Sequence, residues 1–589
     1  MKHIFTKKSG YSLHTWRIQA LWLGLLFFGL AIIGKLFWLQ VWQGREYQDL
    51  ATRQQDSNQE LLPDRGLIYA QDTRVKSGEA LKLSPLAVNQ TFYLLYAQTF
   101  AVTDPINTAT KLNEILDLPP TVVEKMTEQL RKDNDPYEPL VHRVTEEKIK
   151  QIEALGLPGI KWEEEKLRYY PGNNNSSNLL GFVGWVNDSL VGQYGLEGYF
   201  DKELTGRKGF SQSARDGAGR LIGVAEENYQ APQNGDDLIL TIDSSIQDYA
   251  CGQLDEAVKK YDADGGAVVV MNPKTGAILA MCGNPNYNPN AYNEVDDIRA
   301  YTNPAIFDPY EPGSVFKPLT LAAALDQGKI TPDMTYEDKG EEKIAEFTIR
   351  NSDLKAHGTV DMVGVLKLSL NTGAIFAMRQ IGPEIFRGYM EKFGFGELAG
   401  IELNKEVAGT ISSLSKRGEI YAATASFGQG IMVTPLQLVA AYGALANGGQ
   451  LMKPYIVAEI HRATGEIEKT APQMRRQVIS ERSATLISGM MVQVVREGYG
   501  KLAGVPGYYI AGKTGTAQVT EAGQAGYGNR TIHTFAGFGP VANPVFVMAV
   551  RLDHPTAARF AESTATPVWG NIAKFILNYY QVEPDETSN

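Results

Sequence analysis

A serine followed three residues later by a lysine can supply a nucleophile and its base, and the sequence contains this spacing twice. One copy pairs Ser314 with Lys317, and the other pairs Ser413 with Lys416. Residues three apart on a helix share one face, so a neutral lysine amine can reach the serine hydroxyl and accept its proton. Because so short a pattern also recurs by chance, the flanking residues must decide between the copies.

The flanking residues favour Ser314. It follows the chain-turning residues Pro312 and Gly313 and precedes an apolar helical stretch, residues 319–325, which predicts that Ser314 lies at the start of a helix. The positive end of the helix dipole disfavours an ammonium group and favours an oxyanion. Both effects suit a neutral Lys317 as the base and a developing negative charge beside Ser314.

Pro318 has no N–H to donate, so the carbonyl of Ser314 is predicted to stay free in the first turns of this helix. The copy at Ser413 is followed by Arg417 and Gly418, which form a poor start for a helix. We interpret that copy as a solvated loop.

The tripeptide Lys-Thr-Gly also occurs twice, at Lys274 and at Lys513. Two apolar, β-prone runs, residues 267–271 and 277–281, flank the first copy and predict a hairpin with Lys274 near its tip. Turn residues need no functional reason at such a position, so this copy is interpreted as structural.

The second copy follows a strand predicted at residues 508–511 and continues it, so Lys513 is expected within a strand that can line a cleft. There Lys513 offers a charge for a carboxylate, and Thr514 and Thr516 offer hydroxyl groups. Gly515 lacks a side chain and is expected to let a substrate backbone approach closely.

A serine and an asparagine two residues apart form the third candidate pair. Ser369 and Asn371 end a helix-like segment, residues 363–370, and place two short polar groups at a helix terminus. Another such pair begins at Ser176 inside an Asn- and Ser-rich turn, where a structural role is expected. In chain order, the three motifs match the set found in serine enzymes that react with penicillin.

These residues resemble the class B penicillin-binding proteins, the D,D-transpeptidases that cross-link peptidoglycan, and the resemblance covers nearly the whole chain. Further blocks that look like this family are residues 310–314, 427–430, 434–437 and 513–518, together with residues 65–69, 168–171 and 195–198, which resemble its non-catalytic pedestal domain. Residues 70–73 read Ala-Gln-Asp-Thr where the family often has Asp-Arg-Asn-Gly, so the pedestal is expected to differ locally there.

The resemblance implies an acyl-transfer mechanism. Ser314 would attack the D-Ala–D-Ala carbonyl of a stem peptide, Lys317 would take its proton, and Ser369 would relay a proton to the leaving amine. Asn371 would hold the substrate amide. The acyl-enzyme would then be resolved by an amine from a neighbouring stem peptide, or by water.

The resemblance also implies how charge is stabilised. The backbone amides of Ser314 and Thr516 would form the oxyanion hole, while Lys513, Thr514 and Thr516 would bind the terminal carboxylate. Such donors contribute about 3 kcal/mol each to the transition state. No metal or organic cofactor is implied. The implied partners are stem peptides, glycan made from a lipid-linked precursor, β-lactam antibiotics and, by analogy, a polytopic membrane glycosyltransferase.

The elements that must hold these residues predict a mixed α/β (α+β) domain. Strands are expected near both ends of this domain and form an antiparallel sheet, at residues 267–271, 277–281, 508–511, 534–538 and 545–550. Helices between them are expected to cover the sheet, at residues 319–325, 363–370 and 435–446. Before the sheet, Asp243 and Ser244 can cap a helix, with Gln247 completing a capping box on Ser244.

The amino-terminal segment of residues 18–42 is apolar enough to span about 30 Å of hydrocarbon. Large residues follow the run where a signal peptide would have a cleavage site, so an uncleaved anchor is predicted. Lys2, Lys7, Lys8 and Arg17 precede it without an acidic residue, so the amino terminus is expected in the cytoplasm and the rest outside. A buried core helix is the alternative.

Five regions are therefore predicted. They are a short cytoplasmic tail (1–17), a transmembrane anchor helix (18–42), an elongated, β-rich pedestal outside the membrane (43–235), a penicillin-binding transpeptidase domain (236–580) and a disordered tail (581–589). The boundary near residue 235 rests on residues 231–237, a run that combines chain-breaking residues with charge.

Composition narrows the class of protein. With 43% hydrophobic and 21% charged residues among 589, the chain is globular, and its length predicts more than one domain. A formal net charge of -11 leaves no broad basic surface, so nucleic acid is not expected as a partner. Cys251 and Cys282 are the only cysteines; one bridge between them stays open, and cysteine content does not decide the redox compartment.

Three other functions would use some of the same residues. Residues 507–514 match the letters of a phosphate-binding loop, but strand-like residues lie inside the match, and Gly515 follows it where a helix is required. A membrane-tethered β-lactamase or β-lactam sensor would carry the same motifs, although the long pedestal favours a synthase. A non-catalytic wall-binding scaffold would not need every polar residue of the site.

Overall fold

The computed structural model describes residues 13–42, 56–74, 82–187, 189–214, 228–520 and 527–585. Parts of the two predicted tails, residues 1–12 and 586–589, lie outside the described residues. The chain forms two compact units, one of Met1–Pro63 with Arg207–Gln233 and the other of Asp64–Gly206 with Asn234–Asn589.

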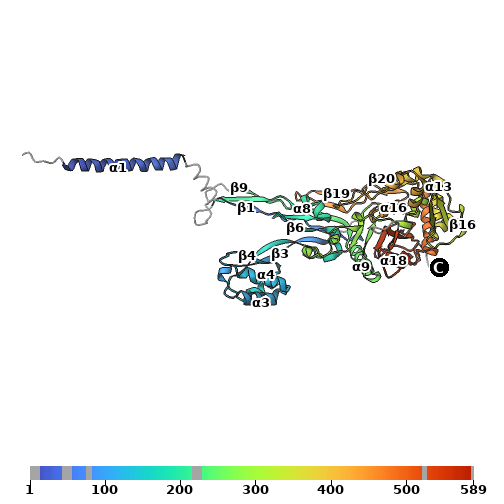
Figure 1. Cartoon of the computed structure of the whole chain (residues 1–589), viewed down its shortest axis with the longest axis horizontal. Coiled ribbons are helices and arrows are strands. Elements are labelled where there is room, and N and C mark those ends of the chain that lie inside the picture. Colours follow the sequence, from blue (N-terminus) through green and yellow to red (C-terminus); the bar gives the residue numbers. More distant parts are fainter. Residues whose placement is uncertain are drawn as a thin grey trace, which may run out of the picture. The chain divides into compact units, whose positions relative to one another are not determined.

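The first unit contains the apolar amino-terminal helix. Helix α1 (Leu13–Phe37) continues into a π-helical turn, Trp38–Trp42 (Figure 1). Within it, Trp16–Val41 has a mean hydropathy of 2.1 and no part of it is buried, unlike a core helix. Its 26 residues rise about 39 Å, enough to cross a membrane. The unit also holds a three-stranded sheet of β1 (Asp56–Leu61), β8 (Gly209–Ala214) and β9 (Asn228–Gln230).

The second unit contains the predicted antiparallel sheet. Its strands lie in the order β12-β11-β23-β22-β21, and their bounds are Gly265–Met271 (β11), Ile278–Asn284 (β12), Ala511–Thr520 (β21), Tyr527–Gly539 (β22) and Phe546–Asp553 (β23). Strands from both ends of the domain therefore pair in one sheet, as predicted. Strand β21 lies at an edge, so one side of its backbone is unpaired within the sheet.

Helices cover both faces of this sheet. Side chains alternate across a strand, so Ala267 and Val269 of β11 pack in one core while Val268 and Val270 pack in the other. The first core includes α11 (Lys317–Asp326), α16 (Pro435–Ala446) and α17 (Glu481–Glu497), and the second includes α9 (Ser244–Tyr261) and α18 (Ala565–Tyr579).

Smaller elements surround the first core. They are the helices α10 (Pro304–Phe307), α12 (Met362–Lys367), α13 (Asn371–Ile381), α14 (Pro383–Lys392) and α15 (Glu419–Ala425), and the paired strands β13 with β16 (Thr335–Asp338, Gly358–Asp361), β14 with β15 (Glu341–Ile344, Phe347–Arg350) and β17 with β20 (Gln450–Met452, Met474–Gln477).

Two local predictions differ from the structure. The strand predicted from Tyr508 begins only at Ala511, because the N–H of Tyr508 donates to the carbonyl of Val505 in a turn through Gly507, where φ is +85°. The helix predicted to run to residue 370 ends at Lys367.

Helix α9 is capped by Asp243 rather than by Ser244. The Asp243 carboxylate accepts hydrogen bonds from two backbone N–H groups of the first turn. Gln247, expected to complete a capping box, instead bonds to both the N–H and the carbonyl of Met281 in β12. A partner distant in the sequence thus replaces the local cap.

The pedestal is built on another sheet of the second unit. Its strands lie in the order β19-β18-β10-β2-β3-β4, with β5 also paired to β3, and their bounds are Ile68–Gln71 (β2), Leu83–Ala97 (β3), Glu138–Val144 (β4), Ile160–Tyr169 (β5), Asp237–Asp243 (β10), Val457–His461 (β18) and Ile467–Lys469 (β19). Strands from both sides of residue 235 share this sheet. The domain boundary predicted near that residue stays a prediction.

Helices α3 (Pro105–Leu116), α4 (Pro120–Leu130) and α5 (Glu146–Ala154) pack on β3, β4 and β5 around a core of their own. The rest of the pedestal consists of short elements, α6 (Ser177–Leu180), β6 (Phe182–Val186), β7 (Ser189–Gln193), α7 (Gly195–Tyr199) and α8 (Asp201–Thr205).

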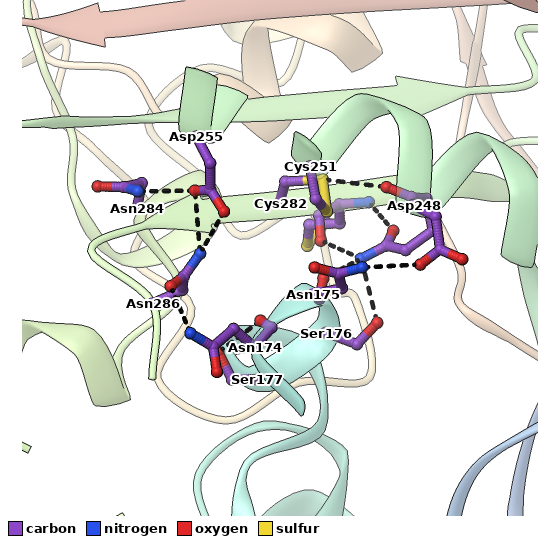
Figure 2. The surroundings of a disulfide bond; sticks show 12 residues. Asn174, Asn175, Ser176, Ser177, Asp248, Cys251, Asp255, Cys282, Asn284 and Asn286 are labelled. Carbon is purple, nitrogen blue, oxygen red and sulfur yellow. Dashed lines mark hydrogen bonds between the residues drawn. A yellow bond between two sulfur atoms is a disulfide. The ribbon is translucent and has the colours of Figure 1, made fainter. Parts of the chain in front are cut away.

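The two cysteines are paired, a point that composition left open. A disulfide joins Cys251 in α9 to Cys282 in β12 (Figure 2). An Asn-rich turn of the pedestal contacts the same helix, since Asn175 donates to the Asp248 carboxylate at 3.1 Å and accepts from Gln247 at 3.1 Å (Figure 2). The disulfide therefore ties together the helix and strand beside which this turn lies.

Candidate active site

Ser314 lies in a 3₁₀ turn, Gly313–Phe316, that leads directly into α11. Residues i and i+3 eclipse in such a turn, so Lys317 lies on the same side of the chain as Ser314. The N–H of Lys317 donates to the carbonyl of Ser314, which is therefore not free, contrary to the prediction. Pro318 lacks the N–H that would bond to this carbonyl in an α-helix, but the 3₁₀ turn supplies the N–H of Lys317 instead.

Close backbone contacts hold the segment around Ser314. Gly313 has a left-handed backbone (φ +59°), and its N–H donates to the carbonyl of Gly428 at 3.0 Å. A Cβ at Gly428 would lie 2.2 Å from the Gly313 carbonyl oxygen, so only glycine allows this approach. On the other side of the serine, the Tyr442 hydroxyl donates to the carbonyl of Val315 at 2.6 Å.

Lys317 is fully buried, and its amine bonds to Ser369. Its Nζ donates to the Ser369 carbonyl oxygen at 2.5 Å and to Oγ at 3.2 Å. Burial and the nearby Lys513 amine hold the pKa of Lys317 well below its ordinary value. A neutral amine has two N–H groups and one lone pair. Ser369 takes up both N–H groups, so the lone pair remains for a proton.

Ser369 lies in the turn between α12 and α13, not inside a helix. Its backbone is left-handed (φ +56°), which is uncommon for a residue with a side chain. Asn371 is the first residue of α13, and its side chain donates to the carbonyl of Arg350 at 2.8 Å. The structure thus brings Ser369 to Lys317 and holds Asn371 two residues away.

Lys513 is fully buried near Lys317. Its amine donates to the carbonyl of Thr514 at 3.1 Å and to the hydroxyl of Thr514 at 3.2 Å. Burial lowers the pKa of Lys513 to about 7. Within the part of the chain that the structure describes, no carboxylate pairs with Lys513 or Lys317. The Lys513 amine, in turn, disfavours the charged form of Lys317.

Gly515 faces the turn that carries the nucleophile. A Cβ at this position would lie 2.9 Å from the Pro312 carbonyl oxygen and 2.9 Å from the Val315 side chain. Its missing side chain thus lets β21 pack against the Ser314 turn, whereas the sequence had suggested an approach by substrate. Thr514 is mostly buried, and the Thr516 hydroxyl oxygen accepts from a backbone N–H, that of Ala561, at 3.1 Å. The hydroxyl hydrogen of Thr516 is left for an acceptor.

Glu311 is a site residue that motif spacing did not single out. Its carboxylate accepts from the N–H of Gly430 at 2.9 Å and from the hydroxyl of Tyr527 at 2.9 Å. Burial raises the pKa of this carboxyl group. The only sequence signal for Glu311 is its place in the block that precedes Ser314.

The duplicate motifs have other surroundings. Lys416 is exposed and lies 5.3 Å from the centre of the Tyr421 ring, and Ser413 sits in a separate 3₁₀ turn. The backbone of Lys274 is held in a turn by the side-chain oxygen of Asn272 at 2.9 Å. Ser176 accepts a hydrogen bond from Gln247 at 3.4 Å. The Ser413 hydroxyl is buried without a hydrogen-bond partner among the described residues, contrary to the predicted solvated loop. The copies at Lys274 and Ser176 have the surroundings of ordinary turns.

The phosphate-loop alternative is wrong. A phosphate-binding loop requires a helix after its threonine. Thr514 instead lies inside strand β21, which continues to Thr520.

In the pedestal, the three family-like blocks meet at one carboxylate. Glu197 is fully buried and accepts from Arg65 Nε at 2.7 Å and from Arg168 Nε at 2.6 Å. Arg65 also pairs with Asp201 at 2.9 Å. Residues that are more than 100 positions apart in the sequence therefore form one ion cluster.

Family models match both parts of the chain. A model of the penicillin binding protein transpeptidase domain matches residues 266–574. A model of the penicillin-binding protein dimerisation domain matches residues 60–240.

Named proteins are similar over most of the chain. Stage V sporulation protein D of Bacillus subtilis is 35% identical over 560 residues, which cover 94% of this chain and 84% of that protein. The probable peptidoglycan D,D-transpeptidase PenA of Neisseria gonorrhoeae is 31% identical over 477 residues, covering 80% and 78%. A crystal structure of penicillin binding protein 3 from Mycobacterium tuberculosis with aztreonam has a TM-score of 0.68 and 25% identity, covering 90% of this chain and 98% of that one.

Proposed function

The chain belongs to the class B penicillin-binding proteins, and on that premise we propose which of its residues carry out the reaction. It is a peptidoglycan D,D-transpeptidase, a serine acyl-transferase that acts on stem peptides and binds β-lactams.

We propose that Ser314 is the nucleophile and Lys317 its base. Ser314 Oγ forms an ester bond to the D-Ala–D-Ala carbonyl carbon while its proton moves to Lys317 Nζ. The proton then passes through Ser369 to the amine of the terminal D-Ala, which leaves as the C–N bond breaks. In the second half, the amine of another stem peptide attacks the ester, its proton returns along the same groups, and Ser314 is released protonated.

One observation carries this assignment. Lys317 is fully buried, without a carboxylate partner among the described residues, and its pKa is well below the ordinary value. A base must be unprotonated before the reaction starts, and these surroundings favour the neutral amine.

The remaining motif residues are proposed to bind substrate. The backbone N–H groups of Ser314 and Thr516 form the oxyanion hole, and each such donor stabilises the transition state by about 3 kcal/mol. Lys513, Thr514 and Thr516 bind the substrate carboxylate, which restores the charge of Lys513 on binding. Asn371 holds the substrate amide, and Gly515 supports this arrangement by keeping β21 against the turn of Ser314.

We also propose that everything after the anchor lies outside the membrane. The basic residues before α1 favour this orientation. The disulfide of Cys251 and Cys282 supports it as well, since such bonds persist in oxidising compartments. The five-region division of the chain remains part of this proposal, and so does the partner, a polytopic glycosyltransferase that docks on the anchor, which rests on family analogy alone.

Protease added to intact spheroplasts tests the orientation. The large domain should be digested, and its protection would reverse the proposed topology.

Covalent labelling tests the site. Purified protein incubated with a fluorescent penicillin should carry one acyl group on Ser314, located by mass spectrometry of the adduct. Ser314→Ala should abolish labelling, whereas Ser413→Ala, the matched control at the second serine-lysine pair, should leave it intact. An adduct on Ser413, or no adduct on folded wild-type protein, would overturn the assignment.

A further inference from the structure

Helix α13 starts at Asn371, yet the residue before this asparagine cannot cap the helix. The N-cap position is held by Leu370, which has no acceptor in its side chain. The first N–H groups of a helix have no partner within it and need an acceptor from elsewhere. Asn351, just after strand β15, provides one: its Oδ1 accepts from the N–H of Asn371 at 2.9 Å and from the N–H of Thr372 at 3.3 Å.

A buried carboxylate fixes the orientation of Asn351. The Asn351 Nδ2 donates to both carboxylate oxygens of Asp338, at 3.1 and 3.0 Å. Asp338 also accepts from the Thr372 hydroxyl at 2.7 Å and from the N–H of His357 at 2.9 Å. Backbone N–H groups only donate, so the oxygen of Asn351 must face α13 and its NH₂ group must face Asp338. Both side chains are almost completely buried.

The end of strand β15 also holds the segment that carries Ser369 and Asn371. Ser369, which takes up the N–H groups of Lys317, lies two residues before the capped helix and has a left-handed backbone. A non-glycine residue keeps such a conformation only where its surroundings impose it. The side chain of Asn371 bonds to the carbonyl of Arg350, the neighbour of Asn351. Strand β15 and its end therefore fix the position of Asn371 through both backbone and side chain.

We propose that Asp338 and Asn351 act together as positioning residues for acylation. Asn351 caps α13 from outside, Asp338 holds Asn351, and the capped helix keeps Ser369 on Lys317 and Asn371 in its substrate-binding position. Neither residue touches the reacting atoms. The inference rests on the proposed roles of Ser369 and Asn371, and it adds two residues that lie outside the three sequence motifs.

An exchange of the two side chains tests this proposal. Asn351→Asp places a second carboxylate against Asp338, and Asp338→Asn places an NH₂ group against donors such as the N–H of His357. Each single variant should acylate about 10-fold to 100-fold more slowly, because a shift of about 1 Å in a catalytic group can cost ~100-fold. The double variant again pairs one carboxylate with one amide, but the NH₂ group at position 338 still faces a donor other than residue 351, so only part of the lost rate should be recovered.

The measurement is the acylation rate constant at saturating fluorescent penicillin, determined for full-length protein together with the melting temperature. Asn178→Asp is the matched control: Asn178 is also buried, and its Nδ2 donates to the carbonyl of Ala300 at 2.6 Å, a contact that involves neither Asp338 nor Asn351. The control should melt at a lower temperature with an unchanged acylation rate per folded molecule. Rescue by the double variant is a readout that loss of stability alone would not produce.

Wild-type labelling on Ser314 in the same experiment separates this inference from the function. If wild type is labelled and both single variants react at its rate, or if the double variant is no faster than the slower single variant, the positioning role is wrong and the function stands. If wild type is not labelled, the proposed function itself fails. Should the single variants not fold, Thr372→Val removes one bond to Asp338 with little change of shape. A loss of about threefold is expected for it, and an unchanged rate would overturn the proposal.

Discussion

The pedestal and the candidate active site each hold two basic side chains largely away from solvent, but they do so in opposite ways. In the pedestal, Arg65 and Arg168 share the carboxylate of Glu197. In the candidate active site, Lys317 and Lys513 lie buried without a carboxylate among the described residues. The pedestal cluster holds the fold, whereas the two lysines are proposed to perform chemistry.

The residue types follow from these roles. An arginine stays protonated at any pH a protein experiences, so a buried arginine needs an anion. Burial alone would raise the pKa of Glu197, but Arg168 and Arg65 hold it below its ordinary value, so the cluster keeps its charges. A lysine can lose its proton instead, which burial promotes. Lys317 is therefore suited to be a base, and neither pedestal arginine is.

The largest effect is expected when an arginine, the basic residue of the pedestal cluster, replaces Lys317. Lys317→Arg puts a permanent cation where a neutral amine is needed, so acylation by penicillin should fall at least ~100-fold, the typical contribution of a general base. The second-order acylation rate measures this, after a check that the variant melts cooperatively. Acylation near the wild-type rate would show that Lys317 is not the base.

The reverse experiment removes the anion from the pedestal. Glu197→Gln leaves Arg168 buried without an anion, whereas Arg65 keeps its pair with Asp201. An uncompensated buried charge typically destabilises a protein by about 3–5 kcal/mol. Thermal or denaturant unfolding should show this loss, while the acylation rate per folded molecule stays unchanged. A lower acylation rate in fully folded protein would mean that the pedestal cluster also shapes the catalytic site.

A smaller effect is expected at Lys513. Lys513 has a pKa of about 7, so it loses its charge as pH rises through 7, and it should then bind a β-lactam carboxylate more weakly. Lys513→Arg keeps the charge at every pH and pairs well with carboxylates, so acylation should remain measurable and the loss of affinity above pH 7 should disappear.

Pre-steady-state acylation between pH 6 and 8 distinguishes the affinity from the rate constant in this variant. Complete loss in Lys513→Arg with retained activity in Lys317→Arg would mean that the base and the carboxylate partner had been exchanged.

The smallest effect is expected for Arg65→Lys in the pedestal. The guanidinium of Arg65 bonds to Glu197, to Asp201 and to the hydroxyl of Thr205, and a lysine amine cannot match this fork. The charge is kept, so the loss should be only about 1–2 kcal/mol, seen as a small fall in melting temperature. A loss as large as that of Glu197→Gln would show that geometry, not charge, dominates this cluster.

Features with local causes could be read from the amino-acid order. The helix predicted over residues 435–446 has these bounds, because Thr434 caps it and Pro435 begins it. The apolar run before residue 42 predicts a long helix, and the hairpin of β11 and β12 follows from two β-prone runs around a turn. The residue types of the three motifs and their order along the chain can likewise be read from the sequence without knowledge of the fold.

Other features depend on partners far away in the chain. Gly515 packs against Pro312, about 200 positions earlier in the chain. Gln247 bonds to β12 rather than to the end of its own helix. Asn351 caps a helix that starts 20 residues later. No spacing rule reports such contacts, because folding alone brings these groups together. The same holds for the two lysines, because their burial lowers the pKa of both amines and cannot be read from the spacing of the motifs.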